Sequence, residues 1–394
     1  MPIELTARTE AGARLVAIAE GLSERLAARA AEHDREGTYP FEAIEALKAA
    51  GYFAAPVPVE LGGLGVASAH DLVVASSRLA RGDASVAIGV NMHLLAVLNM
   101  ERRRQAAVAA GAERRAVAFA ASLEQIVRDR VILAAAISEP GQDLTRPATR
   151  ATRTESGWRI DGRKMFCTMS PAATDLYVSV TSAEDEGERY AYAMVPVHAA
   201  GVVVHDDWDA LGMRASGSNS VSFDGVELPE SGVRGGFAAG DKEPYMERNL
   251  VAGPFHAAAS LGIAESADAL ARRAAVGRIN GDARPRMLVA DNAVDLAAAR
   301  GVLSRAALLI DESDAQLESL FAEAQAAKAF VNEAAARVVD RALALSGGAG
   351  YVNGSPLARA YRDVKAGTFM HPLGANRAYD YLGSVALGEE TALH

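Results

Sequence analysis

The feature that most constrains the fold of this 394-residue chain is the spacing of its apolar residues, which changes twice along the sequence. Within 1–130, apolar residues recur at spacings of three and four, which is typical of amphipathic helices. Within 131–236, short runs rich in β-branched and aromatic residues are separated by turn-forming clusters, as in strands. Alanine-rich stretches with a helical period fill 237–394. This order predicts three domains with these boundaries.

The helical regions differ in length between the two ends of the chain. Residues 9–35 predict one amphipathic helix, and 40–51 predict a short one with Pro40 at its start and Gly51 just past its end. Small residues in the later stretches allow helices to pack closely. Those later stretches are 244–275, 285–312 and 314–345. We expect an α+β multidomain protein with an N-terminal α-helical domain, a central β-barrel-like domain and a C-terminal four-helix bundle.

Charge and composition exclude several classes of partner. The net charge is -10, from 50 acidic and 40 basic residues, which argues against nucleic acid or an anionic membrane as the main partner. The chain shows no secretory signal and no uninterrupted apolar stretch of about eighteen residues, so we expect a cytoplasmic location. The single cysteine, Cys167, is expected to be a small apolar filler. The histidines show no ligand spacing, so no metal is expected.

Five segments carry recognisable motifs. They are VPVELGGLGV (57–66), ISEPGQDL (137–144), DGRKMFCTMSPAATDLYV (161–178), WDALGMRASGSNSVSFDGVELPE (208–230) and GGAGYVNGSPLARAYRDVKAG (347–367). Each resembles a segment of the acyl-CoA dehydrogenase superfamily, and all five stand in that family's order. The order of helices, strands and helical bundle is also that of the family. The resemblance covers nearly the whole chain and implies a flavin-dependent oxidoreductase.

The resemblance gives roles to residues around a flavin ring that lies between the β domain and the C-terminal bundle. Ile137 and Ser138 match the T-E-P loop, where a hydroxyl bonds the pyrimidine edge. Thr168 matches the threonine of W-I-T-N beside the flavin N5 atom. Phe166 replaces the usual tryptophan as an apolar wall. The alternative for each hydroxyl is an ordinary residue of a loop or strand end.

A glycine-rich turn, with Gly347, Gly348 and Gly350, follows the last long helix. Glycines let a backbone approach a ligand closely. The resemblance implies that this turn contacts the ADP half of FAD across a subunit interface. A helix C-cap is the alternative, and both roles are compatible. The expected cofactor is therefore FAD, with FMN as the alternative, in a homo-oligomer that is a dimer or tetramer.

The residue expected to do the family's chemistry is missing. A dehydrogenase removes a proton beside a thioester with a carboxylate, and in one branch this is a glutamate shortly after Y-R-D. His371 stands in that place here. A second branch carries its glutamate at the position that aligns with Ala252, five residues beyond Glu247. Five residues exceed one helical turn, so Glu247 is expected to face elsewhere.

Further departures affect cofactor and substrate contacts. The segment GRINGDARPRM (277–287) lacks the arginine motif that holds the FAD pyrophosphate, and Ala344 replaces a glutamine. The A-G-S-D loop has contracted around Gln142, which remains a candidate substrate contact. In this combination of losses the chain resembles the flavin monooxygenase branch of the superfamily. That branch includes proteins similar to dibenzothiophene monooxygenase and to indole and amino-sugar oxygenases. Such enzymes take loosely held reduced flavin from a separate reductase.

That branch implies a monooxygenase that uses O₂ and a flavin C4a-hydroperoxide to hydroxylate a small, aromatic molecule. His371 and His93 are expected to handle protons beside Thr168, because imidazole accepts or donates a proton at neutral pH. The alternative for His93 is a satisfied core histidine. Arg214 is expected either to steer an anionic substrate group or to cap a turn.

Two other functions remain open from the sequence. One is an FAD-dependent acyl-CoA or acyl-carrier α,β-dehydrogenase that uses Glu247 or an unidentified base. The other is a non-catalytic relative that keeps the scaffold to bind flavin or another ligand. The retained Ser138 and Thr168 argue against the second.

Overall fold

The computed structural model describes residues 3–141, 143–184, 187–276 and 283–393. The first helices are α1 (Glu10–Glu36), α2 (Phe41–Ala49), α3 (Ala69–Ala80), α4 (Ala84–Ala109) and α5 (Glu113–Arg128), with short 3-10 turns η1 (Tyr52–Ala54) and η2 (Val59–Leu61). The strands are β1 (Leu133–Ala136), β2 (Arg150–Thr154), β3 (Gly157–Cys167), β4 (Asp175–Glu184), β5 (Gly187–Pro196), β6 (Val202–Val204), β7 (Asn219–Pro229) and β8 (Val233–Ala238), with η3 (Ser170–Ala172), η4 (Arg214–Ser216) and η5 (Glu230–Gly232). The last helices are α6 (Glu243–Asn249), α7 (Ala252–Val276), α8 (Arg284–Glu312), α9 (Leu317–Ser346), α10 (Gly348–Tyr351), α11 (Pro356–Asp363) and α12 (Ala375–Leu387), with η6 (Val364–Phe369). The predicted order of helices, strands and helices is confirmed.

Local capping explains where the N-terminal helices begin and end. Thr9 caps α1 by accepting a hydrogen bond from the Gly12 amide, and Asp83 caps α4 in the same way. Gly37 ends α1 in the left-handed conformation, with φ of 65°, which glycine adopts without steric cost. These caps are made by residues next to the helix ends, so local sequence sets where each helix begins and ends.

One predicted helical stretch, 244–275, is two helices. The structure ends α6 at Asn249 and begins α7 at Ala252. Pro254 has no amide hydrogen to donate to the carbonyl of Leu250, so a continuous helix is disfavoured at this point. The break matters because it presents the end of α6 to the interior.

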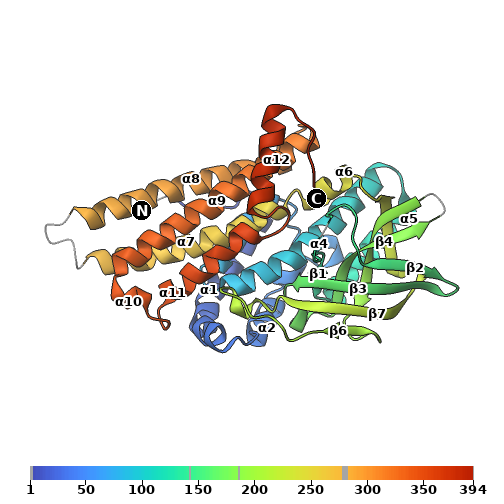
Figure 1. Ribbon diagram of the computed structural model, residues 1–394, viewed down its shortest axis with the longest axis horizontal. Helices are drawn as coiled ribbons and strands as arrows, with labels where there is room; N and C mark the ends of the chain where they lie inside the picture. Colours follow the sequence, from blue (N-terminus) through green and yellow to red (C-terminus); the bar gives the residue numbers. More distant parts are fainter. Residues whose placement is uncertain (1–2, 142, 185–186, 277–282, 394) are drawn as a thin grey trace.

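The strands form one eight-stranded sheet in the order β6-β7-β3-β2-β4-β5-β8, with β1 pairing with β4. β1 and β2 both run parallel to β4, and the neighbouring pairs are antiparallel. Figure 1 shows this sheet at one end of the molecule and the long C-terminal helices at the other. Cys167 lies in the buried core of the sheet, as predicted.

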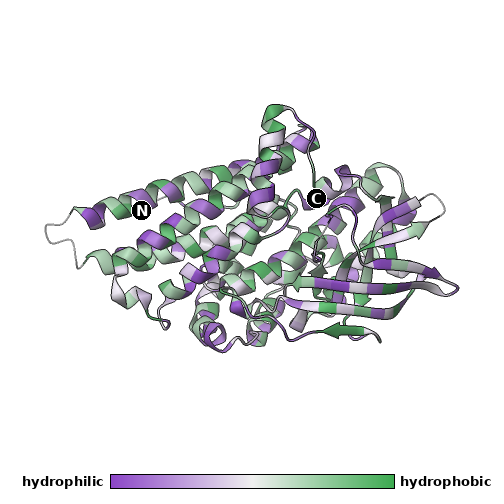
Figure 2. Ribbon diagram, viewed as in Figure 1, coloured by the Kyte–Doolittle hydropathy of each residue, from purple (hydrophilic) through white to green (hydrophobic). Residues whose placement is uncertain are grey.

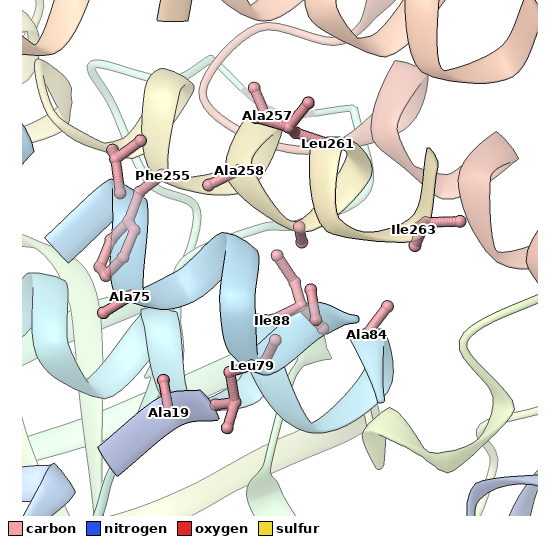
Figure 3. Close-up of a cluster of buried hydrophobic side chains, with 14 of the residues drawn as sticks. Ala19, Ala75, Leu79, Ala84, Ile88, Phe255, Ala257, Ala258, Leu261 and Ile263 are labelled. Carbon is pink, nitrogen blue, oxygen red and sulfur yellow. The ribbon is translucent and has the colours of Figure 1, made fainter. Parts of the chain in front are cut away.

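The helical core lies where α3, α4 and α7 meet. Figure 3 shows side chains from these helices, such as Leu79, Ile88 and Phe255, directed toward a common interior. Farther along the bundle, α9 packs against both α7 and α8. Apolar residues alternate with polar ones along the exposed helices in Figure 2, as expected for helices with one buried face. By length and composition α4 is apolar enough to cross a membrane, but most of it is buried inside this fold.

Candidate functional site

A cavity of about 580 Å³ lies between the sheet and the helices. Its wall includes one face of α4, the end of β1, the end of β3, the η4 turn, the α6–α7 break and the segment 365–371. Five residues predicted to surround a flavin line it together. They are Ile137, Ser138, Phe166, Thr168 and His371. Elements from all three regions of the chain therefore meet at one site.

The end of β3 presents an aromatic ring and a hydroxyl to the cavity. Phe166 has a positive φ of 55° and packs edge-on against Trp208, with ring centroids 6.1 Å apart. The Thr168 hydroxyl accepts a hydrogen bond from Ser218 over 2.9 Å, and Ser218 in turn lies 2.7 Å from Ser216. The Thr168 hydroxyl itself donates to the Phe166 carbonyl over 3.4 Å, a long bond that a ligand acceptor at this wall can replace.

The loop that carries Ser138 is held by a buried ion pair. Lys164 contacts Glu139 over 2.6 Å and also donates to the carbonyl of Ile137. Burial raises the pKa of the Glu139 carboxyl, but the Lys164 charge and hydrogen bonds from Thr149 outweigh it and hold that pKa below its ordinary value. Glu139 therefore fixes the loop and is not a free base.

His371 lies opposite this wall and is oriented by Asn249. Its Nε2 atom is 2.7 Å from Asn249 Oδ1, while the Asn249 amide nitrogen donates to the carbonyl of Tyr245. The amide oxygen can only accept, so Nε2 of His371 carries the proton and Nδ1 carries the lone pair. Burial, followed by the charge of Lys328, lowers the pKa of His371 to about 3. His371 is thus neutral at physiological pH.

Lys328 holds the backbone on both sides of His371. Its ammonium group, on α9, donates to the carbonyls of Met370 and Leu373. Burial lowers the pKa of Lys328 to about 7. The same group faces His256, whose pKa is held well below its ordinary value by burial first and by the Lys328 charge next. His256 lines the cavity, and its Nδ1 atom has no hydrogen-bond partner among the described residues.

Carboxylates are missing from the cavity wall. Among the described residues that line it, none is an aspartate or a glutamate, whereas Arg248, Arg362 and Lys365 carry positive charge. Glu247 is exposed and is not part of the lining. The described wall therefore offers no base of the kind that a thioester dehydrogenase needs.

The cavity fits a flavin ring. Three of its lining side chains, Phe166, Leu211 and Phe369, are 57%, 67% and 80% exposed, which leaves apolar surface for a flat aromatic group to cover. The hydroxyls of Ser138 and Thr168 supply hydrogen bonds at the same wall. Reduced or oxidised flavin held there would supply two-electron redox chemistry.

His93 is not where it was expected. Its Nε2 atom donates to the carbonyl of Phe53 over 2.9 Å, and its Nδ1 atom accepts from the Leu133 amide over 3.0 Å. It is fully buried and absent from the cavity wall, and burial lowers its pKa to about 4. The expectation of a proton-handling His93 was wrong, and the satisfied core histidine is what the structure shows.

Arg214 also has a structural role. Its guanidinium donates to the carbonyl of Asp34 and to the carboxylate of Asp209, and it does not line the cavity. The turn-capping alternative was therefore the right one for Arg214. Gln142 lies outside the described residues. Arg362, which the sequence did not single out, lines the cavity and pairs with Asp34.

The glycine turn is not part of the cavity of its own chain. Gly347 caps α9 with φ of 62°, and Gly347 and Gly348 are exposed while Gly350 is buried. A flavin contact from this turn would thus have to reach a second copy, and it stays a prediction. The segment 277–287, expected to grip the cofactor weakly, lies partly outside the described residues.

Asn249, Lys328, His256 and Arg248 were missed by sequence reasoning. No motif marks them. Lys328 lies among the buried residues of α9, but in the sequence it cannot be told from a lysine on the exposed face of a helix. The break caused by Pro254 was the one usable signal near Asn249, because a helix end exposes side chains in new directions.

Comparison with known proteins decides the family. Models of the acyl-CoA dehydrogenase N-terminal, middle and C-terminal domains match residues 14–102, 134–226 and 234–376. This chain belongs to the acyl-CoA dehydrogenase family. It is a flavin-dependent oxidoreductase of the acyl-CoA dehydrogenase fold.

Within the acyl-CoA dehydrogenase family the chain is similar to several flavin enzymes. L-evernosamine nitrososynthase of Micromonospora sp. is 35% identical over 96% of this chain and 91% of its own. A structure of KijD3 with FMN and dTDP-3-amino-2,3,6-trideoxy-4-keto-3-methyl-D-glucose is 31% identical, covers 99% of this chain and 97% of its own, and has a TM-score of 0.90. The dibenzothiophene monooxygenase TdsC from Paenibacillus sp. A11-2 shares the fold at 22% identity over 96% of this chain and 98% of its own, with a TM-score of 0.81.

Proposed function

We propose that this protein is a flavin-dependent monooxygenase that oxidises the amino nitrogen of a nucleotide-linked amino sugar, with reduced flavin supplied by a separate reductase. The observation that carries the proposal is a cavity wall with no described carboxylate and with a neutral imidazole, His371, opposite the expected flavin wall. Relatives named as amino-sugar nitrososynthases, at 34% and 35% identity, support the substrate class.

An amine must lose its proton before its nitrogen can attack an oxygen atom. The cavity favours this deprotonated form because burial disfavours the charged ammonium and no described carboxylate in the wall stabilises it. The positive charge of Lys328, which holds the backbone on both sides of His371, acts in the same direction. The wall therefore lowers the pKa of a bound amine.

His371 then orients the amine. Its Nε2 proton is committed to Asn249, so its Nδ1 lone pair is available to accept an N–H from the substrate. This contact would hold the nitrogen lone pair toward the opposite wall, where Thr168 lies. With flavin bound, its two electrons allow one atom of O₂ to join the nitrogen while the other leaves as water.

Cofactor identity is part of the proposal. FMN and FAD share the ring that Ser138, Phe166 and Thr168 would contact, and the KijD3 complex supports FMN. The glycine turn does not line the cavity of its own chain, so an ADP contact from it would have to come from a second copy, and FAD remains the alternative cofactor.

To test the proposal, FMN or FAD is reduced anaerobically in the presence of the purified chain. O₂ and a dTDP-linked amino sugar are then added. Mass spectrometry should show a hydroxylamine heavier by one oxygen atom after one equivalent of reduced flavin and O₂. A second equivalent of both should oxidise it to the nitroso compound, with water as the other product. Protein that instead retains yellow flavin, bleached by an acyl-CoA without any reductase, would overturn the proposal in favour of the dehydrogenase.

Hydroxylation of an aromatic molecule is a second candidate. Trp208, Tyr177 and Tyr192 all line the cavity, and aromatic walls stack well on aromatic ligands. Indole offered in the same assay tests this candidate, and product from indole but not from the amino sugar would favour it.

A further inference from the structure

A second group of charged and aromatic residues lies in the same cavity, away from the flavin wall. Tyr177 and Tyr192 stack with centroids 4.4 Å apart and an angle of 11° between their planes. The Arg248 guanidinium lies 3.9 Å above the Tyr192 ring, and its Nη1 atom donates to the Tyr177 hydroxyl over 3.4 Å. All three residues line the cavity.

Arg248 is buried without a carboxylate. It is 6% exposed, it forms no ion pair with the described residues, and its Nε atom has no hydrogen-bond partner among them. Burying a charge without a counter-ion is unfavourable, and stacking on Tyr192 offsets only part of that cost. A buried, unpaired guanidinium that faces a cavity is thus suited to an anionic ligand.

A second arginine, Arg103, adds charge at the same end. It stands one turn after Asn99 on α4, and Asn99 lines the cavity and donates to the Arg248 carbonyl over 2.9 Å. Burial holds the pKa of Arg103 below its ordinary value, and the charge of Arg248 acts the same way. The charge of the exposed Glu247 carboxylate acts to raise the pKa of Arg103, but the two residues form no ion pair.

The position of this group relates it to the reacting end of the cavity. Arg248 immediately precedes Asn249, the residue that orients His371. Along α4, Gly89 lies against Met169 at the flavin wall, whereas Asn99 contacts Arg248. Ten helical residues span about 15 Å, so the Arg248 end of the cavity and the wall near Met169 are separated along α4 by about that length, and an extended ligand can lie between them.

We infer that Arg248, above the Tyr192 ring, and the nearby Arg103 form the seat for the diphosphate of a nucleotide-linked substrate. The inference rests on the proposed function for the identity of the ligand. Guanidinium groups bind phosphate oxygens through paired N–H donors, and Arg248 is already held rigidly by its aromatic contacts. The phosphate of FMN has the same chemistry, so the test must separate the two sources.

The test measures binding to the purified full-length chain by calorimetry, with dTDP, thymidine and FMN as separate probes. Arg248→Met should raise the Kd of dTDP about 10-fold or more, since a charge-assisted hydrogen bond to phosphate is lost, and should leave thymidine and FMN affinities unchanged. Arg103→Met should weaken dTDP in the same direction by a smaller factor. Arg273→Met, an exposed arginine on α7, serves as the matched control and should change nothing.

The outcomes decide between the alternatives. Three outcomes would each overturn the seat. They are unchanged dTDP affinity in both variants, no binding of dTDP to the wild type, and a weakened affinity for FMN in place of dTDP. If Arg248→Met does not fold, Arg248→Lys and Arg103→Met give the same decision, because the lysine keeps the charge but loses the paired donors. Oxidation of an amino sugar with unchanged dTDP affinity would sink the seat alone. Arginine-dependent dTDP binding without any oxidation would sink the proposed function alone.

Discussion

The Nε2 atom of His371 lies 2.7 Å from the Oδ1 atom of Asn249, which fixes the tautomer of a neutral histidine at the wall of the cavity. The two residues are 122 positions apart in the chain. Their contact depends on the break between α6 and α7 and on the docking of the segment after η6 against α9.

Replacing Asn249 tests this contact. Asn249→Leu should lower kcat about 5-fold, because the His371 ring loses the hydrogen bond that orients it, a bond worth about 1 kcal/mol. Asn249→Asp places a carboxylate there and should raise the pKa of His371 toward its ordinary value, so that turnover becomes pH-dependent near neutrality. Steady-state pH profiles of the three proteins check this, and identical profiles would contradict it.

His93 should contribute to stability and not to turnover. Its pKa is lowered to about 4 in the folded chain, so between pH 4 and 6.5 the unfolded chain binds more protons at this residue. Stability from His93 is therefore present above pH 6.5 and is lost as pH falls, by about 2 kcal/mol between pH 7 and pH 5. Urea unfolding should show this loss reduced in His93→Gln, with KM and kcat unchanged. A large fall in kcat at equal folded fraction would return His93 to the mechanism.

Glu247→Gln should leave turnover within about 2-fold of the wild type, because this exposed carboxylate does not line the cavity. The variant is assayed with the amino sugar and, separately, for flavin bleaching by an acyl-CoA. A loss of amino-sugar oxidation by about 100-fold, or bleaching by an acyl-CoA in the wild type that the variant lacks, would restore Glu247 as a base.

Thr168→Val should weaken flavin binding by about 5- to 10-fold, because the variant removes the hydroxyl that would donate to the flavin. The oxygen of that hydroxyl already accepts a hydrogen bond from Ser218. Thr168→Ser keeps the hydroxyl and is the matched control. Quenching of flavin fluorescence during titration measures both, and equal affinities for the two variants would assign Thr168 to packing alone.

The motif residues that line the cavity lie at the ends of strands, whose alternating pattern can be read from neighbouring residues. Ser138 follows β1 and Thr168 follows β3, and pairing of these segments brings them to one wall. His93 was misjudged because Met92 and His93 differ by about 100° around α4, and an apolar helix gives no sign of which side faces the cavity. Met92 lines the cavity, whereas His93 points to β1.

The sequence by itself determined the succession of helices and strands and the family, since periodicity and motifs are properties of neighbouring residues. It also singled out Ser138, Phe166 and Thr168, which line one cavity, while their contact with flavin stays a prediction. Tertiary structure decided the chemistry. The neutral state of His371, the partners of Arg214 and the unpaired charge of Arg248 all depend on burial and on groups from distant segments. Burial and the choice of partners set the pKa of a side chain and determine which of its hydrogen-bonding groups stay unused. Burial and partners exist only after the domains have packed.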